Sequence, residues 1–214
     1  MIDPSKISQI QTLILSRYDE HGRELPRRET TDPYEILVSE VMSQQTQVAR
    51  VIPKRYAFLD TAPDVQSLAT LDKHTLLSLR SGLGYNNRAL RLQQTAQIII
   101  DQYDGTFPQD EKSLLSLPGI GPYTAHALMA FARNIEVPVL DINIRRVLVT
   151  LLDLPKEISD SDLRDIAIAC IPPGQSRTWH NALMDYGALV LTAKKTDIKS
   201  APQSTFHGSR RRVR

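Results

Sequence analysis

The feature of this sequence that most restricts its fold is the spacing of its apolar residues. Almost throughout the chain, apolar residues recur every three or four positions, and no stretch alternates convincingly between apolar and polar residues. The first spacing places apolar side chains on one face of an α-helix, whereas alternation would indicate a β-strand. The sequence therefore predicts an all-α protein.

Capping and turn residues divide this pattern into separate helices. Asp3-Pro4 begins a first helix that runs to about Tyr18, and Asp32-Pro33 begins a second, because Asp caps a helix and Pro fits its first turn. Further helical patterns, separated by short linkers with Pro or Gly, lie near 46–59, 64–70, 72–80, 86–103, 109–117, 122–133, 142–153, 160–170 and 176–192.

Charge is distributed unevenly along the chain. Seven basic residues and one acidic residue lie within 194–214, a net +6, which leaves −4 for the rest of a chain whose total is +2. A basic tail on a mildly acidic body is typical of proteins that bind phosphates without reading sequence. A solvated, disordered terminus has the same composition, so charge alone leaves both interpretations open.

The single cysteine, Cys170, excludes an internal disulfide and a cluster held by several thiolates of this sequence. No apolar run approaches the roughly 20 residues of a membrane span. The opening residues, MIDPSKISQIQ, are too polar for a signal peptide. We therefore expect a cytoplasmic protein with no membrane partner.

A short glycine-containing turn is the first motif that points to a ligand. Leu117-Pro118-Gly119-Ile120-Gly121 joins two predicted helices, which is the signature of a helix-hairpin-helix. Without a Cβ, Gly119 and Gly121 let backbone amides approach a phosphate, and the next helix adds the positive end of its dipole. An ordinary turn between helices also uses Pro and Gly, but the complete string favours DNA backbone binding.

Two carboxylates lie where a glycosidase would need them. On a helix, Glu40 shares a face with Ile36, Leu37, Val41 and Gln44, so desolvation favours its neutral form, as a general acid requires. Asp141 precedes a predicted helix, where capping bonds keep it ionised and able to stabilise a developing cation. Alone, Glu40 fits the edge of a core and Asp141 a simple N-cap; together they fit cleavage of a glycosidic bond.

Several segments together resemble a known family. The runs 32–48, 82–85, 117–124, 139–148 and 184–188 resemble, in order, the MutY-type adenine DNA glycosylases of the endonuclease III, or helix-hairpin-helix, superfamily. The resemblance covers about residues 25 to 190. It implies a two-lobed all-α fold with a six-helix barrel over 25–134, a second lobe from 1–24 plus 135–192, and a basic tail over 193–214.

The resemblance also implies roles for individual residues. Glu40 falls on the proton donor to adenine and Asp141 on the carboxylate that stabilises the sugar cation. Tyr123 and Asn143 fall on residues that hold these groups and the catalytic water. Gln45 and Tyr85 align with residues that wedge into the base stack, and Gln44 lies beside them; packing under a glycine-rich turn is the plainer role for Tyr85.

Three departures from the family refine this expectation. Lyases of the superfamily carry a Schiff-base lysine at the position of Tyr123, so we expect a monofunctional enzyme. The first cysteine ligand of the family's iron–sulfur cluster corresponds to Leu191, and no cysteine follows, so we expect no cluster and no other cofactor. The sequence ends before the family's second domain, which recognises 8-oxoguanine, and this puts preference for that lesion in doubt.

The sequence thus predicts a monomer that binds double-stranded DNA containing a mismatched or damaged base and hydrolyses the N-glycosidic bond of adenine opposite guanine or 8-oxoguanine. One alternative is a thymine or uracil mismatch glycosylase of the same superfamily, although thymine-type relatives carry arginines at the positions of Gln44 and Gln45. A second is a non-catalytic helix-hairpin-helix module. The presence of both Glu40 and Asp141 argues against it, because an idle buried carboxylate only costs stability.

Overall fold

The computed structural model describes residues 2–44, 48–79 and 86–192. Within these ranges all regular structure is helical, which confirms the all-α prediction. Gln45, Tyr85 and the basic tail lie outside the described residues. The helices are α1 Pro4–His21, η1 Pro26–Arg28 (a 3₁₀ turn), α2 Pro33–Ser43, α3 Val48–Thr61, α4 Val65–Thr70, α5 Lys73–Leu79, α6 Asn86–Tyr103, α7 Glu111–Leu115, α8 Pro122–Arg133, α9 Ile142–Leu151, α10 Asp160–Ala169 and α11 Ser176–Leu189.

Local capping explains where these helices begin. The side chain of Asp3 accepts a hydrogen bond from Ser5 N, and that of Asp32 accepts from Tyr34 N, each with Pro in the first turn. The ends differ from the predicted ones by a few residues. The predicted helix 142–153 stops at Leu151, because Asp153 adopts a left-handed conformation with φ +52°.

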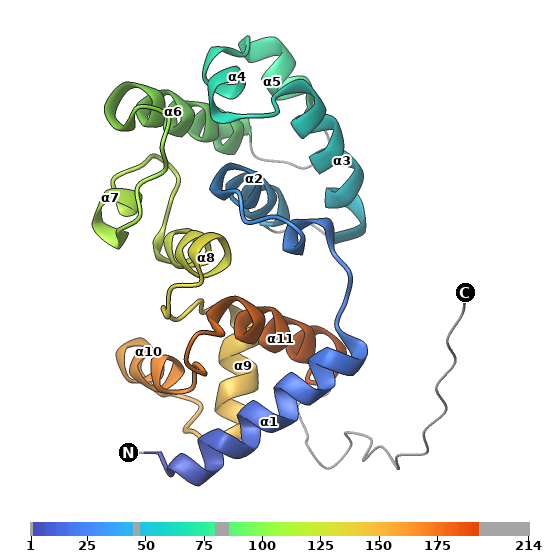
Figure 1. Cartoon of the computed structure of the whole chain (residues 1–214), viewed down its shortest axis with the longest axis vertical. Coiled ribbons are helices and arrows are strands. Elements are labelled where there is room, and N and C mark those ends of the chain that lie inside the picture. The colour runs from blue at the N-terminus through green and yellow to red at the C-terminus, as the bar shows by residue number, and fades with distance from the viewer. Residues whose placement is uncertain (1, 45–47, 80–85, 193–214) are drawn as a thin grey trace, which may run out of the picture.

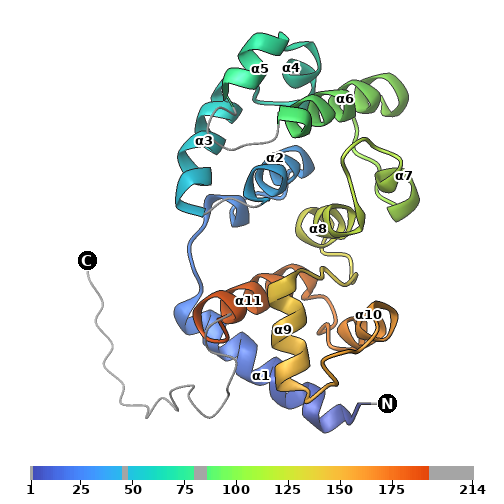
Figure 2. The ribbon, with the colours of Figure 1, turned by 180° about the vertical axis from the view of Figure 1, so that it is seen from behind.

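The helices are arranged in two groups (Figures 1 and 2). One contains α2 to α8, and the other contains α1 together with α9, α10 and α11, so the two ends of the described chain lie in the same group. Two segments cross between the groups, 22–32 and 134–141, and α11 packs against α8. No helix within the described ranges is both long and apolar enough to cross a lipid bilayer.

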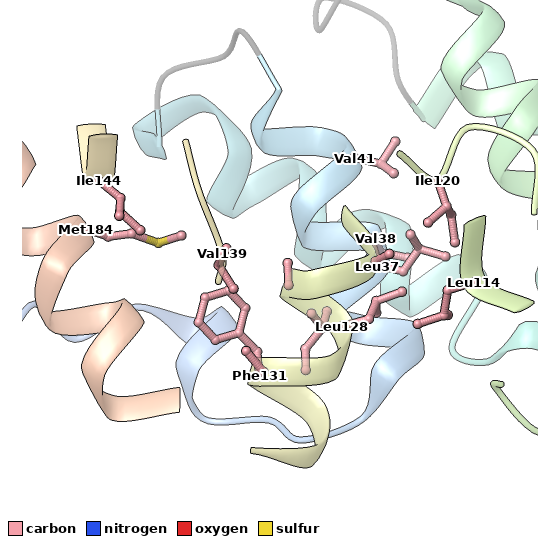
Figure 3. Close-up of a cluster of buried hydrophobic side chains, with 14 of the residues drawn as sticks. Leu37, Val38, Val41, Leu114, Ile120, Leu128, Phe131, Val139, Ile144 and Met184 are labelled. Carbon is pink, nitrogen blue, oxygen red and sulfur yellow. The ribbon is translucent and has the colours of Figure 1, made fainter. Parts of the chain in front are cut away.

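A continuous apolar core runs from one group into the other (Figure 3). Leu37, Val38 and Val41 of α2 pack with side chains of the hairpin and of α8, and the cluster continues through Val139 to Ile144 and Met184. Every residue of α2 from Ile36 to Met42 is buried. The sequence predicted an apolar stripe on one face of this helix, but the structure buries all of its faces because α3, α6 and α8 surround it.

A glycine allows α11 to approach α9 closely. A Cβ on Gly187 would lie 3.1 Å from Asn143 Cβ and 3.3 Å from Val147 Cγ2, closer than ordinary van der Waals contact. Only glycine therefore fits at this contact without moving the start of α9. The close packing determines where Asn143, and with it Asp141, lies relative to α11.

Candidate active site

Glu40 is buried at the boundary between the two groups, with 3% of its surface exposed. Its Oε1 accepts a hydrogen bond from Nη1 of Arg27 at 2.9 Å, and its Oε2 accepts one from the hydroxyl of Tyr123 at 2.9 Å. Both carboxylate oxygens therefore have a donor, one charged and one neutral. The structure brings the predicted pair Glu40 and Tyr123 into direct contact.

Arg27 is a site residue that the sequence analysis missed. It lies in the 3₁₀ turn η1, and its side chain, 20% exposed, also places Nη2 3.5 Å from the sulfur of Met184. The sequence argument placed Glu40 in an apolar stripe and did not include a cation beside it. A three-residue element is too short to show helical periodicity. The adjacent basic pair Arg27-Arg28 was the only sequence signal for a cation in the segment 22–32.

The turn that carries Arg27 is anchored to α11 through Asp185. The backbone N–H and Nε of Arg23 donate to this carboxylate at 2.8 and 2.7 Å, and both Nη atoms of Arg28 donate to it at 2.9 and 2.7 Å. Burial alone would raise the pKa of Asp185, but the hydrogen bonds from Arg28 and Arg23 outweigh burial and lower it. Asp185 therefore stays ionised and holds the segment 22–32 against α11.

Tyr123 is the second residue of α8, just after the hairpin. Burial of its phenol, together with the negative charges of Glu40 and Asp141, raises its pKa well above the usual value. The phenol therefore remains protonated and can donate to Glu40.

Asp141 is the N-cap of α9. Its Oδ1 accepts from the backbone N–H of Ile144 at 2.7 Å, and its Oδ2 accepts from Nδ2 of Asn143 at 3.1 Å. Asn143 in turn accepts a hydrogen bond from Arg146 at 2.8 Å, and Arg146 donates to the backbone oxygens of Gly187 and Leu191. This series of hydrogen bonds orients the carboxylate of Asp141 from two sides.

The conformation of the predicted hairpin turn depends on its glycines. Gly119 has φ +82°, and a Cβ there would lie 3.1 Å from Arg91 Cβ, so both conformation and space require glycine. A Cβ on Gly121 would meet no atom within 4 Å, which leaves the N-terminus of α8 open to approach. Thr95 donates to the oxygen of Pro118 at 2.8 Å and supports the turn from α6.

The remaining predicted DNA-contacting residues are only partly described. Gln44 is the C-cap of α2, and its backbone oxygen accepts from Arg88 at 2.9 Å. Both residues line a pocket that reaches Gly119. The pocket connects the end of α2 with the hairpin. The predicted wedge residues Gln45 and Tyr85 lie outside the described residues.

Curated relatives are similar to this chain over most of its length. The chain is 40% identical over 197 residues to the adenine DNA glycosylase of Mycolicibacterium smegmatis, which covers 89% of this chain and 66% of that relative. It is 32% identical over 224 residues to the human adenine DNA glycosylase, which covers 99% of this chain and 41% of the relative. The chain therefore spans only part of the length of these curated relatives.

Solved structures share the same fold. A thermostable thymine-DNA glycosylase superposes with a TM-score of 0.83 at 26% identity, over 92% of this chain and 93% of the other. An endonuclease III bound to DNA superposes with a TM-score of 0.78 at 21% identity, over 92% of each chain. Residues 38–171, which include Glu40, Tyr123, Asp141 and the hairpin, match the model of one family. The chain belongs to the HhH-GPD superfamily of base excision DNA repair proteins.

Proposed function

We propose that this protein is a monofunctional DNA glycosylase that removes adenine mispaired with guanine or 8-oxoguanine from double-stranded DNA. The observation that carries the proposal is the buried carboxyl of Glu40, held by Arg27 and Tyr123, together with the capped carboxylate of Asp141, whose charge also acts on the Tyr123 phenol. The relatives named adenine DNA glycosylase support the choice of base.

In this mechanism Glu40 is the general acid. The bond between C1′ of the deoxyribose and the base breaks with its electron pair going to adenine, while the proton of the Glu40 carboxyl passes to a ring nitrogen. Adenine then leaves as a neutral molecule rather than as an anion. In the free protein both Glu40 oxygens accept hydrogen bonds and the carboxylate pairs with Arg27, which differs from the neutral form expected from an apolar stripe. Glu40 must therefore take up a proton from water before the transfer, and one oxygen must turn from its partner to the base.

Asp141 stabilises the positive charge that develops on the sugar. Its carboxylate is oriented by Ile144 N and Asn143, so the negative charge is already in place when the oxocarbenium ion forms. Water then attacks C1′, and its proton returns to the enzyme while an abasic site forms. Tyr123 positions the Glu40 carboxyl, and a phenol forms no Schiff base, which supports hydrolysis without lyase chemistry.

We further propose that this chain functions without an iron–sulfur cluster. Leu191, at the position expected for the first ligand, has an apolar side chain with 2% of its surface exposed. Cys170 is buried at the end of α10, where burial raises its pKa to about 11, so it is a poor source of thiolate. These residues do not fit a thiolate-bound cluster, and no step of the mechanism uses one.

Duplex DNA is the expected partner, and a monomer the expected form. The open N-terminus of α8 at Gly121 supports a phosphate contact there. The wedge roles of Gln45 and Tyr85 and the recruitment of DNA by the tail remain part of this proposal, to be tested on the intact protein.

The test combines two variants with a panel of substrates. Glu40→Gln keeps the size and hydrogen bonding of the side chain but delivers no proton, so single-turnover excision should fall by roughly 10²–10⁴. Asp141→Asn removes the fixed charge and should cost on the order of 10²–10³. Both variants should still bind mismatched duplex. Excision by Glu40→Gln within a few-fold of the parent rate would show that Glu40 is not the acid.

The panel contains A, T and U, each opposite G, C and 8-oxoguanine, with hot alkali to reveal abasic sites. We expect adenine release opposite G and 8-oxoguanine. The structural likeness to a thymine-DNA glycosylase favours one alternative, and release of T or U with adenine untouched would establish it. A protein that binds these duplexes and releases no base would be a binding module.

A further inference from the structure

The segment 134–141 crosses between the two groups and ends at Asp141. Two buried histidines, which the proposed mechanism does not use, lie on either side of it. His126 comes from α8 and is 4% exposed, and His180 comes from α11 and is 2% exposed. Because a buried polar ring must form hydrogen bonds, its partners indicate what it does.

The two histidines bind the same peptide group. Nδ1 of His126 lies 2.9 Å from the backbone oxygen of Pro138, and Nε2 of His180 lies 3.1 Å from the backbone nitrogen of Val139. This oxygen and this N–H belong to the single peptide unit that joins Pro138 to Val139. The unit is therefore bound at both ends, from α8 on one side and from α11 on the other.

The remaining ring nitrogens determine which one donates. Nδ1 of His180 lies 2.7 Å from the backbone oxygen of Ser176 and must donate to it, which leaves Nε2 free to accept from Val139 N–H. Burial lowers the pKa of His180 to about 4, so the ring is neutral near pH 7, as this arrangement requires.

His126 has the opposite pattern of bonding. Its two partners, the oxygen of Pro138 and Oε1 of Glu111 at 2.9 Å, are both acceptors. A carbonyl oxygen only accepts, so Nδ1 of His126 donates to Pro138. The peptide oxygen thus receives a donor from α8, and the peptide N–H receives an acceptor from α11. Each histidine therefore satisfies one of the two hydrogen-bonding groups of this buried peptide.

We propose that His126 and His180 are positioning residues that fix the Pro138–Val139 peptide plane and thereby the placement of the Asp141 carboxylate. Asp141 follows this peptide by two residues, so rotation of the plane would redirect the chain as it enters α9. Catalytic groups must be held to within about half an ångström, and a displacement of about 1 Å can cost 10²-fold in rate. This inference rests on the proposed role of Asp141.

The experiment uses the different reach of Asn and Gln. At His180 the peptide contact comes from Nε2, so Gln can place its oxygen near Val139 N–H, whereas Asn keeps only the position of Nδ1. At His126 the peptide contact comes from Nδ1, so Asn can donate to the oxygen of Pro138 and Gln cannot. The harmful substitutions are therefore His180→Asn and His126→Gln.

We expect single-turnover adenine excision to fall roughly 10- to 100-fold in His180→Asn and His126→Gln, and to stay within about threefold of the parent in His180→Gln and His126→Asn. The dissociation constant for mismatched duplex should change less than about threefold in all four. The two harmful substitutions are repeated in Asp141→Asn, where they should slow the residual rate less than about threefold, because the charge that they position is gone.

Equal losses for Asn and Gln at each position, or the same loss with and without the Asp141 carboxylate, would overturn the inference and indicate a purely structural role. If one variant does not fold, the pair at the other histidine tests the same reversal. A parent protein that releases no base contradicts the proposed function itself, whereas an active parent without the reversed pattern contradicts only this inference.

Discussion

The ion pair between Arg27 and Glu40 makes a measurable prediction about stability. The Glu40 side chain is 4% exposed, and after Arg27→Met its carboxylate keeps only the hydrogen bond from Tyr123. Removing one partner of a buried ion pair leaves a buried charge and typically costs about 3–5 kcal/mol. Because domains are stabilised by about 5–15 kcal/mol in total, Arg27→Met should lower the free energy of unfolding at pH 7 by a large fraction.

The converse change should cost less. In Glu40→Gln the stranded group is Arg27, which is 20% exposed and can turn toward water, so we expect a loss of about 1–2 kcal/mol. The double variant, Arg27→Met with Glu40→Gln, strands no charge and should lose about as much as Glu40→Gln alone. The sum of the two single losses should therefore exceed the double loss by about 3–5 kcal/mol.

Urea unfolding at pH 7 measures these free energies. Trp179 is the single tryptophan, it is 1% exposed in α11, and its fluorescence should report the unfolding of the whole chain. Lys6→Met serves as a control, because the pair between Lys6 and Asp153 is exposed at 34% and 79% and should contribute about 0–1 kcal/mol. Single losses that add to within about 0.5 kcal/mol would refute a coupled ion pair.

Three further predictions concern pH, iron and salt. Folding lowers the pKa of His180 from 6.5 to about 4, so below pH 6.5 the unfolded chain binds more protons than the folded chain. The contribution of His180 to the free energy of unfolding should therefore be complete above pH 6.5. It should fall by roughly 3 kcal/mol as the pH drops to 4. Urea midpoints across this range should decline less steeply in His180→Gln. Purified protein should hold far less than the about four irons per chain of a cysteine-bound cluster, and four irons by elemental analysis would contradict the proposal. Deleting residues 195–214 should weaken binding to all duplexes alike and flatten its dependence on salt, and a changed base preference would place the tail in the recognition surface.

The sequence predicted the helical elements and both carboxylates because these leave local signals. Helical spacing is repeated within each segment, and an Asp before a helix marks its first turn, as Asp32 and Asp141 do in the structure. The hairpin was likewise predicted from five consecutive residues. Each of these features is encoded over a short stretch of chain, so it can be read without knowing which helices are neighbours.

The partners of the carboxylates leave no comparable local signal. Tyr123, 83 residues from Glu40, was expected beside it only from the family resemblance, and the contact of Arg28 with Asp185 across 157 residues was not expected. The histidines bind backbone groups, which every residue carries, so nothing in the sequence at Pro138 or Val139 indicates the contact. Such partners depend on how the helices pack, and only the structure supplies that.

Both positioning networks end on one helix, α11. Asp185 holds the segment with Arg27, which contacts Glu40, while His180 binds the peptide that precedes Asp141. The close contact at Gly187 sets the start of α9 against the same helix. The two carboxylates come from segments 101 residues apart in the chain, yet their positions are fixed relative to one rigid element. A displacement of α11 would therefore move the contacts of both carboxylates together, whereas changes in α10, which lies apart from α2 (Figure 1), should leave their relative geometry unchanged.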